Sequence, residues 1–122
     1  MAIKRAIRWA NRATNTGAGL AYLYSERVRE GELVCVQRLA WEIDKATSGG
    51  NTRVRIYIDR DGARWVIAEE DWPIADTIYT VVAPFWLVPG ERICIEIDEA
   101  QASTQAQLWA TGYFTDFPEG FK

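Results

Sequence analysis

The sequence predicts an all-β fold: a single antiparallel β-sandwich with jelly-roll-like connections and an N-terminal arm. First, about seven or eight segments with strand patterning recur at a spacing of roughly 8 to 12 residues. Second, clusters of Gly, Pro, Asn and Asp separate these segments, and no stretch has the periodicity of a long helix. Third, strands with one apolar and one polar face must bury their apolar faces together, which favours two packed sheets.

The size and composition of the chain fit one globular domain. It has 122 residues and 13.9 kDa, enough to bury roughly two-thirds of its unfolded surface. Hydrophobic residues make up 48% and charged residues 25%, a composition that argues against disorder. No apolar run approaches the roughly 20 residues that span a bilayer. We therefore expect no membrane partner, no secretory signal and folding in a cytoplasm.

The first 25 residues carry an excess of positive charge. They contain no acidic residue and have four basic residues, Lys4, Arg5, Arg8 and Arg12. The net charge of −3 therefore divides into +4 for this segment and −7 for the remainder. Such asymmetry predicts contact with an acidic surface, although a solvated terminus explains it equally well. We predict a basic arm and hinge over residues 1–19 and the sandwich over residues 20–122.

The conformation of the arm stays open at this point. Ile3 and Ile7 are four residues apart, as on one face of a short helix, whereas Arg5, Ile7 and Trp9 also fit the alternation of a strand. Residues 14–19 are turn-prone and predict a flexible hinge.

Each predicted strand rests on a local pattern of alternation. The segments are Leu20–Ser25, Glu32–Asp44, Arg53–Asp59, Arg64–Ala68, Ile74–Val82, Pro84–Val88, Arg92–Asp98 and Gln107–Phe114. The second is long for one strand, which predicts a bulge or bend near Gln37 and Arg38. Asp61-Gly62 predicts a short hairpin turn, and Pro89-Gly90 a turn before the strongly alternating Ile93 strand.

The two cysteines are too few for a disulfide scaffold. Cys35 shares its parity with Leu33, Leu39 and Trp41, which predicts a core position. Cys94 lies on the opposite parity to the isoleucines around it. We therefore predict two free thiols.

The sequence does not provide the residues of common catalytic sites. Histidine is absent, which removes the usual general base and the commonest zinc ligand. Glu69, Glu70 and Asp71 could in principle supply the paired acids of a glycosidase, but we expect a solvated acidic connection. Asp59, Asp61 and Gly62 match the opening of a calcium loop, and a hairpin turn explains them better. We expect no enzyme, cofactor or metal.

The aromatic residues suggest a binding surface. Trp9, Trp72 and Trp86 lack an obvious row of core neighbours, whereas Trp41 and Trp65 are expected in the core. Exposed tryptophans stack on sugars or anchor protein interfaces. The arm also interleaves basic and aromatic residues, as nucleic-acid-binding segments do, but the acidic remainder would repel phosphate, so we do not expect nucleic acid as a partner.

The C-terminal half resembles small β-sandwich virion structural proteins of tailed phages, such as capsid decoration (cement) proteins. The residues that carry the resemblance form an aliphatic-Pro-Gly-acid turn, a small-residue loop and a last strand ending in Gly-Tyr. They are Leu87, Val88, Pro89, Gly90, Glu91, Arg92 and Ile93, the loop Ala100–Thr104, and Leu108, Ala110, Gly112 and Tyr113.

This resemblance implies a non-enzymatic structural protein located on the virion, a capsid decoration protein or another small component of the head or tail. The implied partners are the major capsid protein or another virion protein and further copies of the chain, contacted through the arm and sheet edges. The expected partner-binding residues are Ile3, Lys4, Arg5, Ile7, Arg8, Trp9, Arg12, Trp72 and Trp86. An alternative is a carbohydrate-binding or receptor-binding module that uses an aromatic platform near Trp72 and Trp86.

Overall fold

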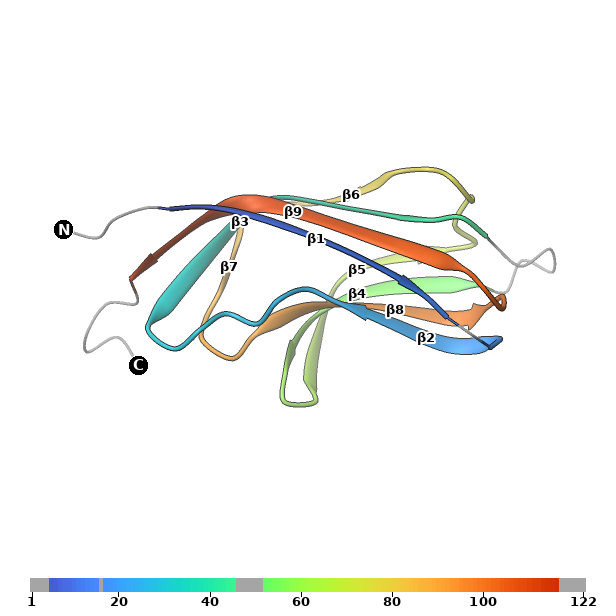
Figure 1. The fold of residues 1–122 in the computed structure, drawn as a ribbon, viewed down its shortest axis with the longest axis horizontal. Helices are drawn as coiled ribbons and strands as arrows, with labels where there is room; N and C mark the ends of the chain where they lie inside the picture. The colour runs from blue at the N-terminus through green and yellow to red at the C-terminus, as the bar shows by residue number, and fades with distance from the viewer. Residues whose placement is uncertain (1–4, 16, 46–51, 117–122) are drawn as a thin grey trace.

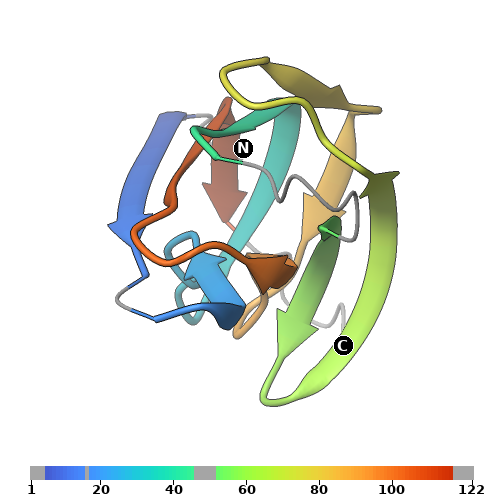
Figure 2. The same cartoon turned by 90° about the vertical axis from the view of Figure 1, so that its right-hand side faces the viewer.

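A computed structural model describes residues 5–15, 17–45 and 52–116 of the chain. Two antiparallel sheets face each other and enclose the core (Figures 1 and 2). Sheet A contains β1 (Arg5–Thr14), β9 (Gln105–Asp116), β3 (Glu32–Ile43), β6 (Tyr79–Val81) and β7 (Phe85–Leu87). Sheet B contains β2 (Gly19–Tyr24), β8 (Arg92–Ala100), β4 (Arg53–Arg60) and β5 (Ala63–Asp71). The predicted β-sandwich is confirmed.

The order of the strands is that of a jelly roll. Sheet A runs β1-β9-β3-β6, with β7 also paired to β3, and sheet B runs β2-β8-β4-β5. The short β6 and β7 lie along the same strand, β3, and together occupy one position of the sheet. The chain therefore crosses between the sheets at every connection except the β4–β5 hairpin and the link within this split position.

The core lies between the inward rows of the two sheets. Ile93, Ile95 and Ile97 of β8 are each at most 2% exposed, as their alternation predicts. From sheet A, Leu39 and Leu108 lie opposite this row and are equally buried. Apolar burial on this scale is the main source of stability in a domain of this size.

The segment predicted as an arm is part of sheet A. β1 pairs with β9 along its whole length, from Arg5 opposite Phe114 to Thr14 opposite Gln105. Ile7 is only 9% exposed and belongs to the core, so β1 gains apolar burial by joining the sheet. This settles the choice between helix and strand and corrects the predicted boundary at residue 19. Residues 1–4 lie outside the described part of the chain.

A bulge in β3 changes which side chains face the core. The pairing of β3 with β9 shifts between Val36 and Arg38, which confirms the predicted irregularity. Before the shift, Val34 and Val36 face the core instead of the predicted Leu33 and Cys35. Cys35 is nevertheless buried, on the outer side of sheet A.

Two strand boundaries differ from prediction. The three acids predicted as a connection, Glu69–Asp71, extend β5, since all three pair with β4 and two of them lie opposite its arginines. The predicted strand Ile74–Val82 is reduced to β6, since only Tyr79–Val81 pair with β3.

Both predicted turns are confirmed. Asp61 and Gly62 have φ of 49° and 91°, the two positive values of a type I′ hairpin turn. At the second turn, Glu91 N donates to Val88 O at 3.0 Å and Gly90 has φ of 87°. Proline followed by a positive-φ glycine makes a type II turn, which directs the chain into β8.

The two cysteines are free, as predicted, and both are buried, although Cys94 was placed on the opposite parity to the core row. Burial raises the pKa of Cys94 to about 11, so its reactive thiolate is scarce at neutral pH. We expect a thiol reagent at pH 8 to leave Cys94 of the native protein unmodified and to modify both cysteines in denaturant. Mass mapping of the labelled peptides measures this, and rapid native labelling of Cys94 would contradict its burial.

Candidate interaction surfaces

The residues predicted to bind partners separate into exposed cations and core side chains. Arg5, Arg8 and Arg12 of β1 are exposed. Ile7 is buried and is corrected from a partner anchor to an internal packing residue, whereas Trp9 is half-buried and only packs against the rim of the core. The other two members of the predicted arm site, Ile3 and Lys4, lie outside the described residues. β1 thus presents basic side chains at the free edge of sheet A.

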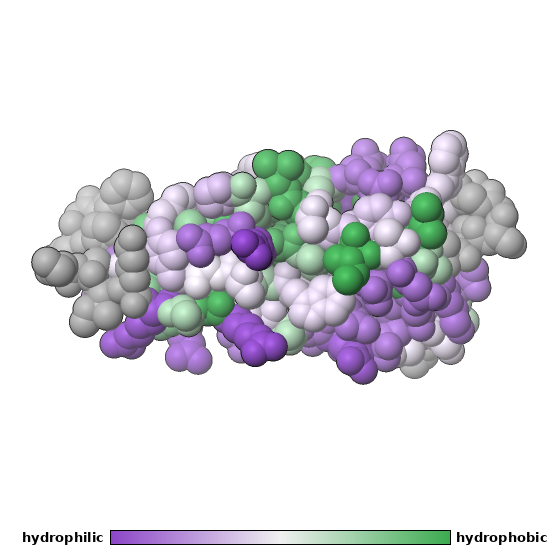
Figure 3. Space-filling view, turned by 90° about the horizontal axis from the view of Figure 1, so that it is seen from above, coloured by the Kyte–Doolittle hydropathy of each residue, from purple (hydrophilic) through white to green (hydrophobic). Residues whose placement is uncertain are grey.

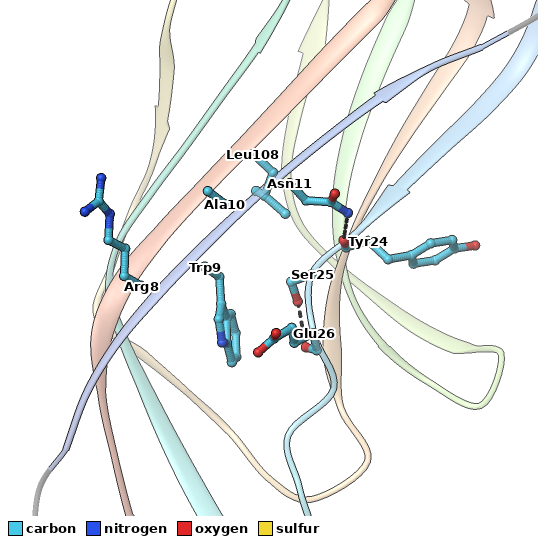
Figure 4. Close-up of a pocket in the computed structure, with 8 residues that line it drawn as sticks. All are labelled: Arg8, Trp9, Ala10, Asn11, Tyr24, Ser25, Glu26 and Leu108. Carbon is cyan, nitrogen blue, oxygen red and sulfur yellow. Dashed lines mark hydrogen bonds between the residues drawn. The ribbon is translucent and has the colours of Figure 1, made fainter.

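A groove of about 320 Å³ lies beside β1, and sequence reasoning did not find it. Trp9 projects into it from β1, with Ser25 and Glu26 on the other side, whereas the Arg8 side chain points away (Figure 4). The side-chain amide of Asn11 donates to Tyr24 O at 2.6 Å and holds the two walls together (Figure 4). The sequence shows Trp9 as a tryptophan without core neighbours, which is one sign of a binding groove. Only the fold brings Trp9 next to Glu26.

A second groove, of about 260 Å³, continues along the same edge. It shares Arg8, Trp9 and Glu26 with the first and extends toward Val28 and Phe114. The open side of the sandwich beside β1 is therefore a long, shallow and polar-rimmed surface.

The outer face of sheet A carries an aromatic pair at β7. Trp86 is 48% exposed and meets the ring of Tyr113 edge-on, with ring centroids 5.8 Å apart. This geometry is favourable for two aromatic rings and holds the indole in place. Seen from above, this side of the molecule has hydrophobic residues among strongly hydrophilic ones (Figure 3).

The structure does not bring Trp86 and Trp72 into one platform. β7 pairs with the start of β3 at Val34–Val36, whereas the loop after Trp72 meets the end of β3, where Asp76 N donates to Ile43 O. At about 3.3 Å per residue these positions are roughly 25 Å apart. Trp72 is 69% exposed, so it remains a separate surface residue.

One predicted core tryptophan is on the surface. Trp41 is 3% exposed, as expected, but Trp65 is 52% exposed. Trp65 has the inward parity of β5, opposite Ile58, yet the β4–β5 hairpin extends away from sheet A, toward the bottom of Figure 1. The alternation predicts on which face of the sheet a side chain lies. It does not predict whether a second sheet covers that face.

The outer face of sheet B holds an ion cluster that the sequence did not reveal. The side chain of Asp59 is 2% exposed and accepts hydrogen bonds from Arg64 Nε at 3.2 Å and Arg92 Nε at 3.1 Å. Burial raises the pKa of Asp59, but the two guanidinium groups outweigh it and hold the pKa below its ordinary value. The carboxylate therefore stays charged and ties β4, β5 and β8 together.

Tyrosine rings cover this cluster. The guanidinium of Arg92 lies 3.7 Å from the ring centroid of Tyr24, and that of Arg64 lies 4.9 Å from Tyr22. Cation–π contacts of this kind favour an arginine that is already positioned by a carboxylate. The arrangement is a cross-strand clamp, since each of its polar groups is used within the fold.

The acidic end of β5 is ion-paired on one side. Arg55 Nε lies 2.7 Å from Glu69, and Arg53 Nε lies 2.8 Å from Asp71. These pairs are exposed and contribute little to stability. Within the described ranges, no group of three acids or cysteines is placed to hold a metal ion, and no helix is long and apolar enough to cross a membrane.

Comparisons with known proteins bear on the fold. No protein-family model matches the sequence, and a search of curated proteins gives no significant match. A chain of the "acidic stable capsid structure of Helicobacter pylori bacteriophage KHP30" superposes with a TM-score of 0.59 at 14% identity, covering 98% of this chain and 95% of that one. The chain shares its fold with a component of a phage capsid structure. A mitogen of Yersinia pseudotuberculosis is matched at a TM-score of 0.49 and 13% identity over 97% of this chain and 93% of that one.

Proposed function

We propose that the chain is a non-enzymatic structural protein of a phage virion, and specifically a capsid decoration (cement) protein. The observation that carries this proposal is the fold, which is shared with a component of a phage capsid structure over nearly the full length of both chains. The aliphatic-Pro-Gly-acid turn, which carries the resemblance to such proteins, also has the predicted conformation. In this function the protein binds the shell and neighbouring copies, and it contributes adhesive surfaces instead of catalysis.

The arginines that β1 presents on the outer face of sheet A are the surface we assign to contact with the shell. Arg5, Arg8 and Arg12 are exposed along one strand, and no acidic residue interrupts them. Charge complementarity accelerates encounter and sets orientation, and it adds most when the partner is acidic. The partner that fits is therefore an acidic surface of the major capsid protein or of another virion protein.

The composition and structure of purified particles test the proposed function. Virions should contain this chain in many copies, and cryo-electron microscopy should place its jelly roll on the outside of the shell. Presence in infected cells but absence from purified particles would contradict the proposal, and so would a position confined to the interior.

A charge-reversal variant should weaken binding to the shell. We expect Arg8→Glu/Arg12→Glu to lower affinity for capsids that lack the chain by about tenfold or more, because the basic edge would then repel an acidic surface. Pull-down of labelled protein with capsids, at concentrations where the chain alone is monomeric, measures the affinity. Arg38→Glu/Lys45→Glu changes the net charge equally at positions away from the edges of the sheets and should bind nearly as well as the wild type.

A further inference from the structure

The described strands leave two long free edges. β1 has ten residues and ends sheet A, and β5 has nine and ends sheet B. The other edges are short: β6 and β7 have three residues each, and β2 has six with an irregular register between Gly19 and Ala21. A long free edge presents unpaired N–H and C=O groups, which can pair with another strand.

The two edges have opposite charge. β1 carries three arginines and no acid, whereas β5 carries Glu69, Glu70 and Asp71 against the single basic residue Arg64. β1 has a net charge of +3 and β5 of −2, so pairing two β1 strands or two β5 strands brings like net charges together, whereas pairing β1 with β5 brings opposite charges together. Like charges on adjacent strands are destabilising, so charge favours pairing of unlike edges.

We infer that β1 of one copy pairs antiparallel with β5 of a second copy. The antiparallel direction places the first half of β1, with Arg5 and Arg8, beside the acidic end of β5. The second half of the edge is partly used within the fold, because the N–H of Arg12 donates to Asn11 Oδ1 and the Asn11 amide donates to Tyr24 O. Opposite-charge pairs across strands add stability to the main-chain bonds.

Exposed apolar side chains on β5 give the contact a second component. Trp65 is 52% and Val66 is 56% exposed, one on each face of the strand. A strand added at this edge would bring further side chains against both of them and remove apolar surface from water. An uncovered, long and partly apolar edge is otherwise prone to uncontrolled association.

A contact between two different edges has consequences for assembly. In a pair of copies one keeps an unused β5 and the other an unused β1, so the contact is heterologous and produces a closed ring or an open chain of copies. The proposed function requires contacts between neighbouring copies, and the inferred pairing of β1 with β5 rests on that function because it describes one such contact. It concerns the chain alone, so it is tested without capsids.

Sedimentation velocity of the full chain, from micromolar to near-millimolar concentration, tests the pairing. The wild type should self-associate, and Arg5→Glu/Arg8→Glu and Glu70→Lys/Asp71→Lys should each weaken this by about tenfold or more. An equimolar mixture of the two variants should associate again, because each supplies an edge that complements the other. Arg38→Glu/Lys45→Glu should behave as the wild type. Dichroism spectra establish that each variant is folded, and Glu70→Gln/Asp71→Asn replaces the lysine pair if that pair unfolds.

The possible outcomes separate this inference from the proposed function. A wild type that stays monomeric throughout, or two variants that fail to restore association when mixed, would overturn the edge pairing. Stronger association of Arg5→Glu/Arg8→Glu with wild type, without any effect of the β5 variant, would show β1–β1 pairing instead. Neither result depends on capsid binding, which the particle experiments measure.

Discussion

Replacing Gly112 with alanine should destabilise the protein by about 3 kcal/mol, the upper range for forcing an extra methyl group into a packed site. A Cβ atom at Gly112 would overlap the carbonyl oxygen of Cys35 and lie 3.0 Å from Gln37 N. Both are backbone atoms at the β3 bulge, where the strand presses against β9. Neither can move away without breaking the pairing of two central strands.

Thermal unfolding followed by circular dichroism measures this effect. A loss of 3 kcal/mol corresponds to a fall in Tm of roughly 10 °C in a domain of this size. Gly17→Ala is the matched control, because a Cβ there meets no atom within 4 Å and the backbone does not have positive φ. Equal melting temperatures for the two variants would contradict the close approach of β3 and β9 at the bulge.

The second large effect is expected at Asp59. Asp59→Asn should cost about 3 kcal/mol, because it leaves the arginines of the cross-strand clamp without the carboxylate that compensates them. Residues close to a hairpin turn are usually exposed and tolerate substitution. The side chain of Asp59 is only 2% exposed, so the loss of stability is expected here. Asp61→Asn is the matched control: its carboxylate is 85% exposed and 3.7 Å from Arg27, and asparagine tolerates the positive φ of the turn. Urea unfolding at pH 7 measures both, and equal midpoints would contradict the clamp.

The same residue gives the stability a dependence on acid. The folded pKa of Asp59 is lowered, whereas an unfolded aspartate titrates near pH 3.9. Its contribution is therefore complete well above pH 4 and is lost as the pH falls through the lower folded value. The difference between wild type and Asp59→Asn should narrow on acidification. A constant difference from pH 7 to pH 2 would contradict a charged, clamped Asp59.

Local patterns in the sequence predict the sheet fold well. The Asp61-Gly62 and Pro89-Gly90 turns and the isoleucine row of β8 were predicted because each depends on neighbours within a few residues. The bulge in β3 was also expected, but its effect on Cys35 was not. A single extra residue reverses the parity on one side of it, and the sequence does not show on which residue the reversal occurs.

The surfaces depend on contacts between distant segments and were predicted less well. β1 was expected as an arm because its only strand partner is β9, a hundred residues later. Trp65 has the pattern of a core residue, and only the absence of a facing strand exposes it. The clamp around Asp59 joins residues of three strands, and no sequence spacing indicates it. Charge is the exception: the basic character of β1 is visible in composition alone.

The pairing of the first strand with the last also determines when the molecule can fold. During synthesis β1 emerges early, but Arg5 has no strand beside it until the region around Phe114 has left the ribosome. Contacts between such distant residues make folding slow, because a large loop must close before any stabilisation is gained. Sheet A is therefore completed only after translation of β9, and until then the nascent chain needs protection from aggregation.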